Sequence, residues 1–332
     1  MEDLKKGLYK LPFSKHNNPN GWIEPTTFCQ LKCPHCYRGA DKENFKPIHR
    51  DIKEVLTEVD ELIKIRNIQT LTIAGGEPLL YPYLDELIKY AVERNLSVMI
   101  NTNGILVDEK RLNELKNLGV TRVVVHLDKY QKRENTFTEE GANRLREYYC
   151  DLFRKVKGVS LGFIMPISGE NVDDLNVLIP FFKNNADVIR LASFTILCES
   201  SPGEQLSDNK VVDSNSVFDK IRNLYNLNYC AYLGRTKSDG ISWLFAYNIF
   251  AGKKFLGSLD KDVVKFIQEE NFKKEKRYLF ASEDNFSSIK FFFYKIFNSS
   301  TRRMFLNYLV GKAKGKIYEQ IILVVNTPKY ID

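Results

Sequence analysis

The sequence has 332 residues, of which 43% are hydrophobic and 27% charged, enough for a full-sized core in one large domain or two smaller ones. No apolar run approaches the roughly 18 residues that a membrane helix needs, and residues 1–6 lack the apolar stretch of a signal peptide. A cytoplasmic protein is therefore expected, and a reducing compartment would also protect the three closely spaced thiols of residues 29–36.

The net charge of +7 comes from the C-terminal region. Residues 251–332 hold 16 Lys and Arg against 9 Asp and Glu, a difference of +7, so the first 250 residues balance. Such a region is compatible with a solvated basic face. It is also compatible with a docking surface for an acidic peptide, a nucleic acid, an anionic lipid or an electron donor.

Strands and helices alternate over the first 200 residues, after a polar lead-in at residues 1–20. Short apolar runs predict the strands, and apolar residues at helical spacing predict the helices. The strands are expected at residues 22–27, 71–74, 97–100, 122–127, 160–165 and 188–195. The helices between them are expected at residues 51–65, 83–94, 109–118, 138–156 and 173–183. Gly119 is a plausible C-terminal cap of the third helix.

This alternation predicts βαβ units and a parallel sheet, arranged as an incomplete barrel or as a doubly wound sheet. In both folds, ligands bind at the carboxyl ends of the strands. Unusual residues follow four of these ends in turn: Cys29–Cys36, Gly75–Pro78, Asn101–Gly104 and Asp128. The sequence therefore predicts one site at this edge of the sheet.

After residue 195 the alternation stops, and residues 199–213 are a polar loop. Helices are expected at residues 217–225, 263–272, 287–298 and 302–310, a strand at 316–325, and either kind of element at 241–250. The expected division is a lead-in at residues 1–20, a core at 21–200 and a basic, aromatic-rich module at 201–332 that covers the mouth of the core. Within this module, Phe291–Tyr294 and its basic neighbours are compatible with a packed amphipathic helix, or with a surface for substrate, lipid or nucleic acid.

Cys29, Cys33 and Cys36 have the spacing C-x3-C-x2-C. Thiolates at this density are typical ligands of an iron–sulfur cluster, zinc or copper(I). A four-iron cluster takes four ligands. The remaining cysteines stand alone: Cys150, Cys198 and Cys230. One iron would then lack a thiolate, and an open coordination position indicates catalysis. The alternatives are an electron carrier and a structural zinc site, for which His35 is poorly placed between two cysteines.

Gly75, Gly76 and Glu77 close a predicted buried strand. Glycines let the backbone approach a ligand closely, and the Glu77 carboxylate can accept a hydrogen bond from an ammonium group. The alternative is a tight turn with a solvated glutamate. The cysteine spacing together with Gly75–Pro78 resembles the radical S-adenosylmethionine (radical SAM) superfamily, and the resemblance covers about residues 20–200.

This resemblance implies an α/β fold, an incomplete (β/α)6 TIM-type barrel with an α+β C-terminal module. It also implies that Cys29, Cys33 and Cys36 are catalytic and hold a 4Fe-4S cluster whose fourth iron binds S-adenosyl-L-methionine. In such enzymes the reduced cluster cleaves that cofactor to a 5′-deoxyadenosyl radical, which abstracts hydrogen from the substrate. One cluster is expected, because the C-terminal third lacks clustered cysteines, and no cobalamin domain is evident.

The resemblance assigns cofactor contacts residue by residue. The segment Gly75, Gly76 and Glu77 would hold the methionyl amino group, and His35 would lie beside the adenine. Further cofactor-binding positions are Thr102, Asn103 and Asp128.

Four other residues are candidates for the same site. His126 would accompany Asp128 on one strand face, unless it is a core histidine. Arg144 would meet the cofactor carboxylate, unless it is a solvated helix residue. Ile164 and Met165 would give the adenine an apolar wall.

These features predict a radical SAM enzyme that acts on a peptide, lipid or biosynthetic metabolite, and the basic C-terminal region is compatible with an acidic substrate. A reducing partner such as flavodoxin or ferredoxin would supply the electron. The alternatives are a nucleic-acid-modifying enzyme of the same kind and, from a different class, a non-catalytic iron–sulfur or zinc-binding protein.

Overall fold

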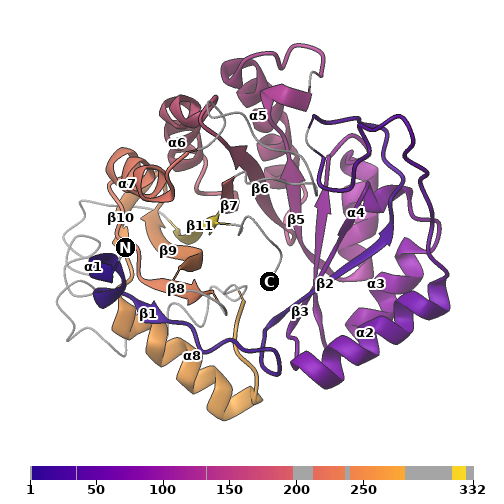
Figure 1. Ribbon diagram of the computed structural model, residues 1–332, viewed down its shortest axis with the longest axis horizontal. Coiled ribbons are helices and arrows are strands. Elements are labelled where there is room, and N and C mark those ends of the chain that lie inside the picture. Colours follow the sequence, from indigo (N-terminus) through magenta and orange to yellow (C-terminus); the bar gives the residue numbers. More distant parts are fainter. Residues whose placement is uncertain are drawn as a thin grey trace.

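The frame of the molecule is one continuous sheet that curves around a central axis (Figure 1). The computed structural model describes residues 2–34, 36–131, 133–196, 212–235, 240–280 and 316–326. Within these ranges, eleven strands form the sheet; ten follow the order β1-β8-β9-β11-β7-β6-β5-β4-β3-β2, and β10 pairs with β9. The curved but open sheet confirms the expected incomplete barrel of parallel strands and intervening helices.

Six parallel strands and five helices of the core occur where the hydrophobic pattern predicts them. The strands are β2 (Asn20–Thr26), β3 (Thr70–Gly75), β4 (Ser97–Thr102), β5 (Val120–His126), β6 (Ser160–Ile167) and β7 (Ile189–Ile196). The helices are α2 (Ile52–Arg66), α3 (Leu84–Glu93), α4 (Glu109–Leu118), α5 (Glu139–Lys155) and α6 (Leu175–Asn184). Gly119 caps α4 with a φ of 99°, a left-handed conformation that favours glycine.

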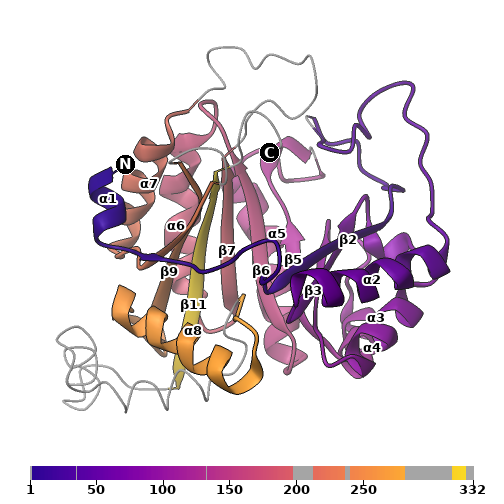
Figure 2. The ribbon, with the colours of Figure 1, turned by 60° about the horizontal axis from the view of Figure 1, so that its bottom comes forward.

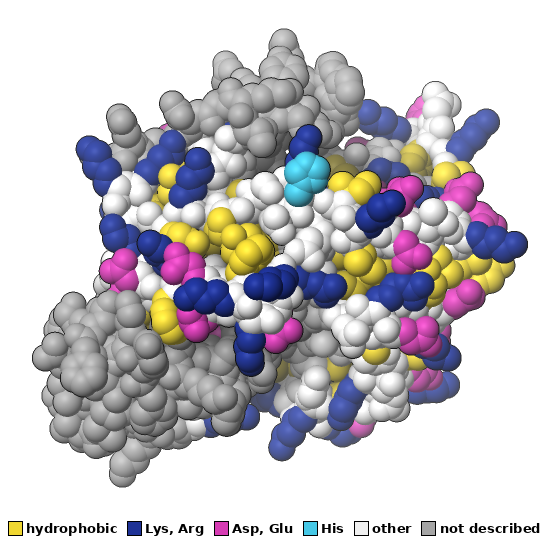
Figure 3. Space-filling model, turned by 90° about the horizontal axis from the view of Figure 1, so that it is seen from below, with side chains coloured by type: hydrophobic (Ala, Val, Ile, Leu, Met, Phe, Trp, Pro, Cys, Tyr) yellow, Lys and Arg dark blue, Asp and Glu magenta, His cyan; other side chains and the backbone are white. Residues whose placement is uncertain are grey.

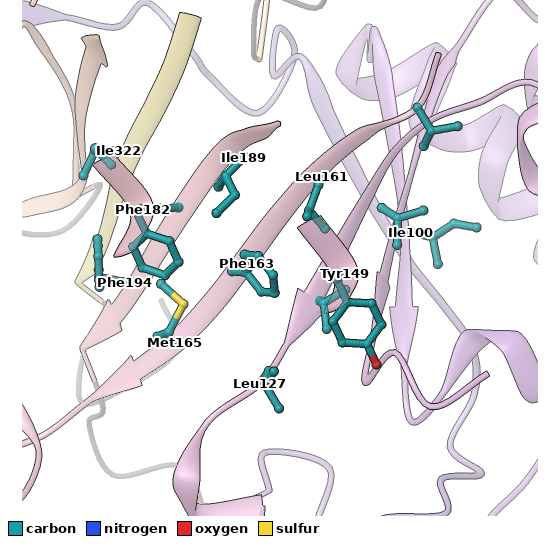
Figure 4. Close-up of a cluster of buried hydrophobic side chains, with 14 of the residues drawn as sticks. Ile100, Leu127, Tyr149, Leu161, Phe163, Met165, Phe182, Ile189, Phe194 and Ile322 are labelled. Atoms are coloured by element: carbon teal, nitrogen blue, oxygen red, sulfur yellow. The ribbon is translucent and has the colours of Figure 1, made fainter. Parts of the chain in front are cut away.

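The helices cover the outer face of the sheet (Figure 1). Alternate strand residues such as Leu161, Phe163 and Met165 face the helices, and Phe182 of α6 packs between them and Phe194 of β7 (Figure 4). The residues between them in the sequence face the inside of the barrel. This alternation follows from the two-residue period of a strand, and it separates a helix-covered core from an inner face.

The C-terminal residues extend this sheet. The added elements are α7 (Ser214–Tyr225), β8 (Ala231–Gly234), β9 (Ile241–Ala251), β10 (Lys254–Ser258), α8 (Lys261–Glu275) and β11 (Ile317–Asn326). Strand β11 pairs parallel to β7 and antiparallel to β9, so it continues the barrel wall beyond the sixth core strand. Residues 241–250, whose pattern is compatible with either kind of element, belong to strand β9. The helices expected at 287–298 and 302–310 lie outside the described residues.

The N-terminal residues close the open side of the barrel (Figure 2). After α1 (Glu2–Lys6), strand β1 (Tyr9–Lys10) pairs with β8 at one edge of the sheet, and the chain then crosses to β2 at the other edge. Helix α8 runs alongside this crossing. Asn67, at the end of α2, donates hydrogen bonds from its amide to the Lys276 carbonyl (2.7 Å) and to Asn17 Oδ1 (3.0 Å).

The charged side chains on the face seen from below are mixed in sign. Lysine and arginine lie among aspartate and glutamate over the visible coloured surface (Figure 3). On α8, for example, Lys265 and Glu269 lie 3.8 Å apart, and Lys273 and Glu270 lie 2.8 Å apart. Among the helices of the described ranges, none is long and apolar enough to cross a membrane. The division of the chain at residues 20 and 200, and a docking role for the basic region, stay predictions.

Candidate cofactor site

The cysteine loop follows β2 directly at the carboxyl edge of the parallel strands. Cys29, Cys33 and Cys36 are each half-buried, and the Cys36 amide donates to the Cys33 carbonyl at 3.2 Å. Burial is the main cause that raises the pKa of Cys33 to about 12, and the nearby Asp128 carboxylate and the other two cysteines act in the same direction. The three thiols are therefore close enough to influence one another and Asp128.

Two glycines allow the end of β3 to lie directly against this loop. The Gly76 amide donates to the Thr26 carbonyl at 2.9 Å, and the Glu77 amide donates to the Phe28 carbonyl at 2.6 Å. A Cβ on Gly76 would lie 2.3 Å from the Phe28 oxygen, closer than any real contact. Gly75 has a φ of +116°, which side chains rarely adopt. The glycine pair thus fixes the base of the cysteine loop.

The Glu77 carboxylate connects the ends of β3 and β4. It is fully buried, and it accepts hydrogen bonds from the Leu79 amide (3.0 Å), the Thr102 hydroxyl (2.7 Å) and the Asn103 amide (2.7 Å). Burial raises the pKa of this carboxyl, although the three donors act in the opposite direction. The geometry makes Glu77 a brace between two strand ends, and its contact with an ammonium group stays a prediction.

Asn103 extends this connection back to the cysteine loop. Its side-chain amide donates to Gln30 Oε1 at 3.0 Å and to Cys29 Sγ at 3.7 Å, while its Oδ1 accepts from the Ile105 amide. A continuous path of hydrogen bonds therefore runs from Glu77 through Asn103 to Cys29. The segments that follow β2, β3 and β4 therefore come together beside the cysteine loop, as predicted.

Asp128 and His126 form a hydrogen-bonded pair at the end of β5. His126 Nε2 lies 2.7 Å from Asp128 Oδ2, and Asp128 Oδ1 accepts from the amides of Tyr130 (2.7 Å) and Gln131 (3.1 Å). Burial acts to raise the pKa of Asp128, but the hydrogen bond and charge of His126 and the two amides lower it overall. Asp128 is thus an ionised carboxylate near Cys33, beside a His126 side chain that is 38% exposed.

Arg133 is a site residue that the sequence analysis missed. Its guanidinium donates to the carbonyls of Asn103 and His126, and its Nε is buried with no hydrogen-bond partner among the described residues. Its charge acts to lower the pKa of Cys33. Arg144 is exposed on α5, and the nearby Arg146 is fully buried in an ion pair with Glu139 at 2.7 Å. Arg133 is therefore a cation close enough to the cysteine loop to act on Cys33.

Residues 23–181 match the Radical SAM superfamily, and the matched segment contains every residue of the site described in this subsection. This part of the chain is a radical SAM domain. Fe-coproporphyrin III synthase of Methanosarcina barkeri is 32% identical over 183 residues, which are 52% of this chain and 43% of that protein. GTP 3′,8-cyclase of Aquifex aeolicus is 29% identical over 184 residues, 52% of this chain and 55% of that protein. The chain thus spans about half the length of these curated relatives.

A solved structure shares the radical SAM fold of this chain. It is the crystal structure of Streptococcus suis SuiB bound to the precursor peptide SuiA, with a TM-score of 0.51 and 17% identity. The likeness covers 70% of this chain and 52% of SuiB. It confirms the fold expected from the strand and helix pattern.

The loop fits the cluster that the radical SAM superfamily implies. Three soft thiols share one short loop, held by the Gly76 contact on one side and by Asn103 on the other. Within the described ranges, no three His, Cys, Asp or Glu side chains could hold one metal ion together. A four-iron cluster does not require the three cysteine thiolates to bind one common ion, because each thiolate binds its own iron.

The remaining candidates separate into inner and outer positions of the radical SAM barrel. Ile164 lies on the inner face, but Met165 packs into the helix-covered core (Figure 4), because neighbouring strand residues point to opposite faces. Cys150 and Cys230 are buried. His35 and Cys198 lie outside the described residues.

Proposed function

We propose that Cys29, Cys33 and Cys36 hold one 4Fe-4S cluster, and that S-adenosylmethionine binds beside it. Bound together, the two groups supply a 5′-deoxyadenosyl radical that abstracts hydrogen from a substrate. The observation that carries the proposal is the hydrogen-bonded path from Glu77 through Asn103 to Cys29, which supports the cysteine loop at the carboxyl edge of a parallel barrel.

The chain's own residues would position both groups. Asn103 donates toward the Cys29 sulfur, which stabilises a thiolate ligand. Gly75 and Gly76 leave room for close backbone approach, and Glu77 keeps the ends of β3 and β4 together. Such a support fixes the reactive geometry before any ligand arrives, which is the main contribution of a protein to cofactor chemistry.

Two charged residues would orient S-adenosylmethionine. The Nε of Arg133, to which no described residue hydrogen-bonds, suits the cofactor carboxylate, because arginine binds carboxylates through charge-assisted hydrogen bonds. Asp128, kept ionised by its donors, would face the cofactor from β5 with His126. Thr102 would support the cofactor site through Glu77, because its hydroxyl donates its hydrogen bond to the Glu77 carboxylate.

The substrate and the electron donor belong to the proposal as well. The curated relatives carry different chemistry in their names, a GTP cyclase and an Fe-coproporphyrin III synthase, and SuiB was crystallised with a peptide. A peptide, a lipid or a biosynthetic metabolite therefore stays the proposed range. A small reducing protein such as flavodoxin or ferredoxin would supply the electron.

Anaerobic reconstitution tests the proposal. The reconstituted chain should hold about four irons, and dithionite with S-adenosylmethionine should release 5′-deoxyadenosine. Cys33→Ala should lose most of the iron and all of the release. Cys150→Ala is the matched control, because Cys150 is buried in the core away from the loop, and it should keep the iron. A chain that holds four irons and releases no 5′-deoxyadenosine would overturn the proposal.

A further inference from the structure

The strand register identifies the residues that face the inside of the barrel at each level. In the middle level, Asn101 of β4 pairs with Val124 of β5, and the level continues through Leu191 and Ile321 to Tyr247 of β9. Val124, Leu191 and Ile321 are at most 4% exposed. The barrel is therefore filled at this level on the side of its C-terminal strands.

Toward the carboxyl ends of the parallel strands, the inner face becomes partly exposed. His126 pairs with Ile164 in the next level, and Thr195, Val325 and Trp243 pair in the level above. Partly exposed residues of this inner face include Asn101, His126, Ile164, Thr195, Val325 and Trp243. They form an accessible inner surface at the same edge of the sheet as the cysteine loop.

This inner surface has two unlike sides. Asn101 and His126 come from β4 and β5, next to the proposed cofactor site. On the opposite side, Val325 and Trp243 pack against the buried cluster of Phe245 and its neighbours, and the Trp243 ring lies 5.6 Å from the Phe280 ring. None of the six residues is a lysine, arginine, aspartate or glutamate. A phosphate-rich ligand such as a nucleic acid would need cations on this surface.

Asn101 has an unused acceptor on the inner surface. Its Oδ1 is buried, and no hydrogen-bond partner reaches it from the described residues. Buried polar atoms are nearly always hydrogen-bonded. An unpaired acceptor in a binding site therefore indicates that a bound ligand supplies the donor. The partner must carry an N–H or O–H donor.

We propose that this inner surface binds the substrate, and that the substrate is an amide-bearing molecule with an apolar side chain. An aromatic or branched aliphatic residue of a peptide has this chemistry: its side chain lies against Trp243 and Val325, and its amide N–H donates to Asn101. The inference rests on the proposed function and narrows its substrate range. A lipid acyl chain would pack against Trp243 and Val325, but it would offer no hydrogen-bond donor to Asn101.

The two tryptophans of the sequence provide the test. In the 332-residue chain carrying Trp22→Phe, Trp243 is the only tryptophan, and its fluorescence reports on the inner surface. N-acetyl-L-phenylalaninamide should shift this emission to shorter wavelength and protect it from acrylamide quenching. N-acetylglycinamide and decanoate, which lack the side chain and the amide respectively, should bind at least fivefold more weakly. The Trp243→Phe chain, which keeps Trp22, should not respond.

Two further variants connect the response to the proposed residues. Asn101→Leu should weaken binding of the phenylalanine amide about fivefold, the effect of one lost hydrogen bond. Val325→Asn should weaken it at least as much by making the wall polar. Equal binding of decanoate, or unchanged affinity in both variants, would overturn the inference. Iron content and 5′-deoxyadenosine release of the Trp22→Phe chain report separately on the proposed function.

Discussion

Asp128 shows how local donors determine the charge of one buried residue. Burial alone would raise the pKa of this carboxyl, but His126 and two backbone amides lower it overall. An acid with a lowered folded-state pKa stabilises the fold above its unfolded pKa of about 3.9. This stabilisation is lost as the pH falls through the lower folded-state value, because both states are then protonated.

Asp128→Asn should therefore cost stability in a way that depends on pH. At pH 7 the substitution should lower the free energy of unfolding by about 2 kcal/mol, since an amide cannot replace a carboxylate that accepts three hydrogen bonds. The difference from the unsubstituted chain should shrink toward pH 3. Urea denaturation at several pH values measures it, with Asp41→Asn in the exposed loop as the control. A difference that stays constant with pH would contradict the assignment.

The site residues that belong to a motif at the end of a predicted strand could be predicted from the sequence. A residue that only the folded conformation of a loop brings to the site could not. The cysteine spacing, Gly75–Glu77 and Asn103 all follow predicted strands, so the sheet edge brings them together. Arg133 follows no periodic pattern, because it lies in the loop between β5 and α5, and only the folded loop brings it to Asn103. Arg144, the arginine expected to meet the cofactor carboxylate, is exposed by its position on α5.

At the scale of elements, local patterns predicted the core and missed the long-range pairings. The six parallel strands are apolar runs between amphipathic helices, so the period of their residues identifies them. Strands β1, β8 and β10 have two, four and five residues, too few for a period to appear. Their pairing depends on segments far away in the sequence, as for β1 with β8.

Strand β11 depends on one buried polar side chain. Gln320 is fully buried, and its amide donates to the carbonyls of Phe182 (3.0 Å) and Ile189 (2.9 Å), while its Oε1 accepts from the Tyr225 hydroxyl. This one residue connects β11 with α6, β7 and α7. Its loss would leave two buried carbonyls and one hydroxyl without these partners.

Gln320→Met should lower the free energy of unfolding by about 3 kcal/mol, because it keeps the side-chain length and removes all three hydrogen bonds. Tyr225→Phe removes one of them and should cost about 1 kcal/mol. Thermal and urea denaturation of both variants give the comparison. Equal losses would mean that the Gln320 contacts with α6 and β7 contribute nothing.

At the scale of the whole molecule, the two ends of the sheet are joined across the open side of the barrel. The chain leaves β1 at one edge and enters β2 at the other, and α8 runs beside it (Figures 1 and 2). Asn67 hydrogen-bonds to both, through Asn17 and the Lys276 carbonyl, and the Asn18 amide donates to the Arg66 carbonyl. The Asn67 side chain therefore contributes two of the contacts that enclose the inner surface laterally.

Asn67→Gly should loosen this closure without unfolding the barrel. Asn67 has a φ of 51°, a left-handed conformation that glycine adopts without strain, so the substitution removes the side chain alone. Hydrogen exchange of residues 11–19 and 272–280 should accelerate about fivefold, the effect of one lost hydrogen bond, while the core strands keep their protection. Asn95→Gly is the matched control, because Asn95 is an exposed left-handed asparagine that follows α3. If both variants exchange alike at residues 11–19, the Asn67 side chain does not hold the barrel closed.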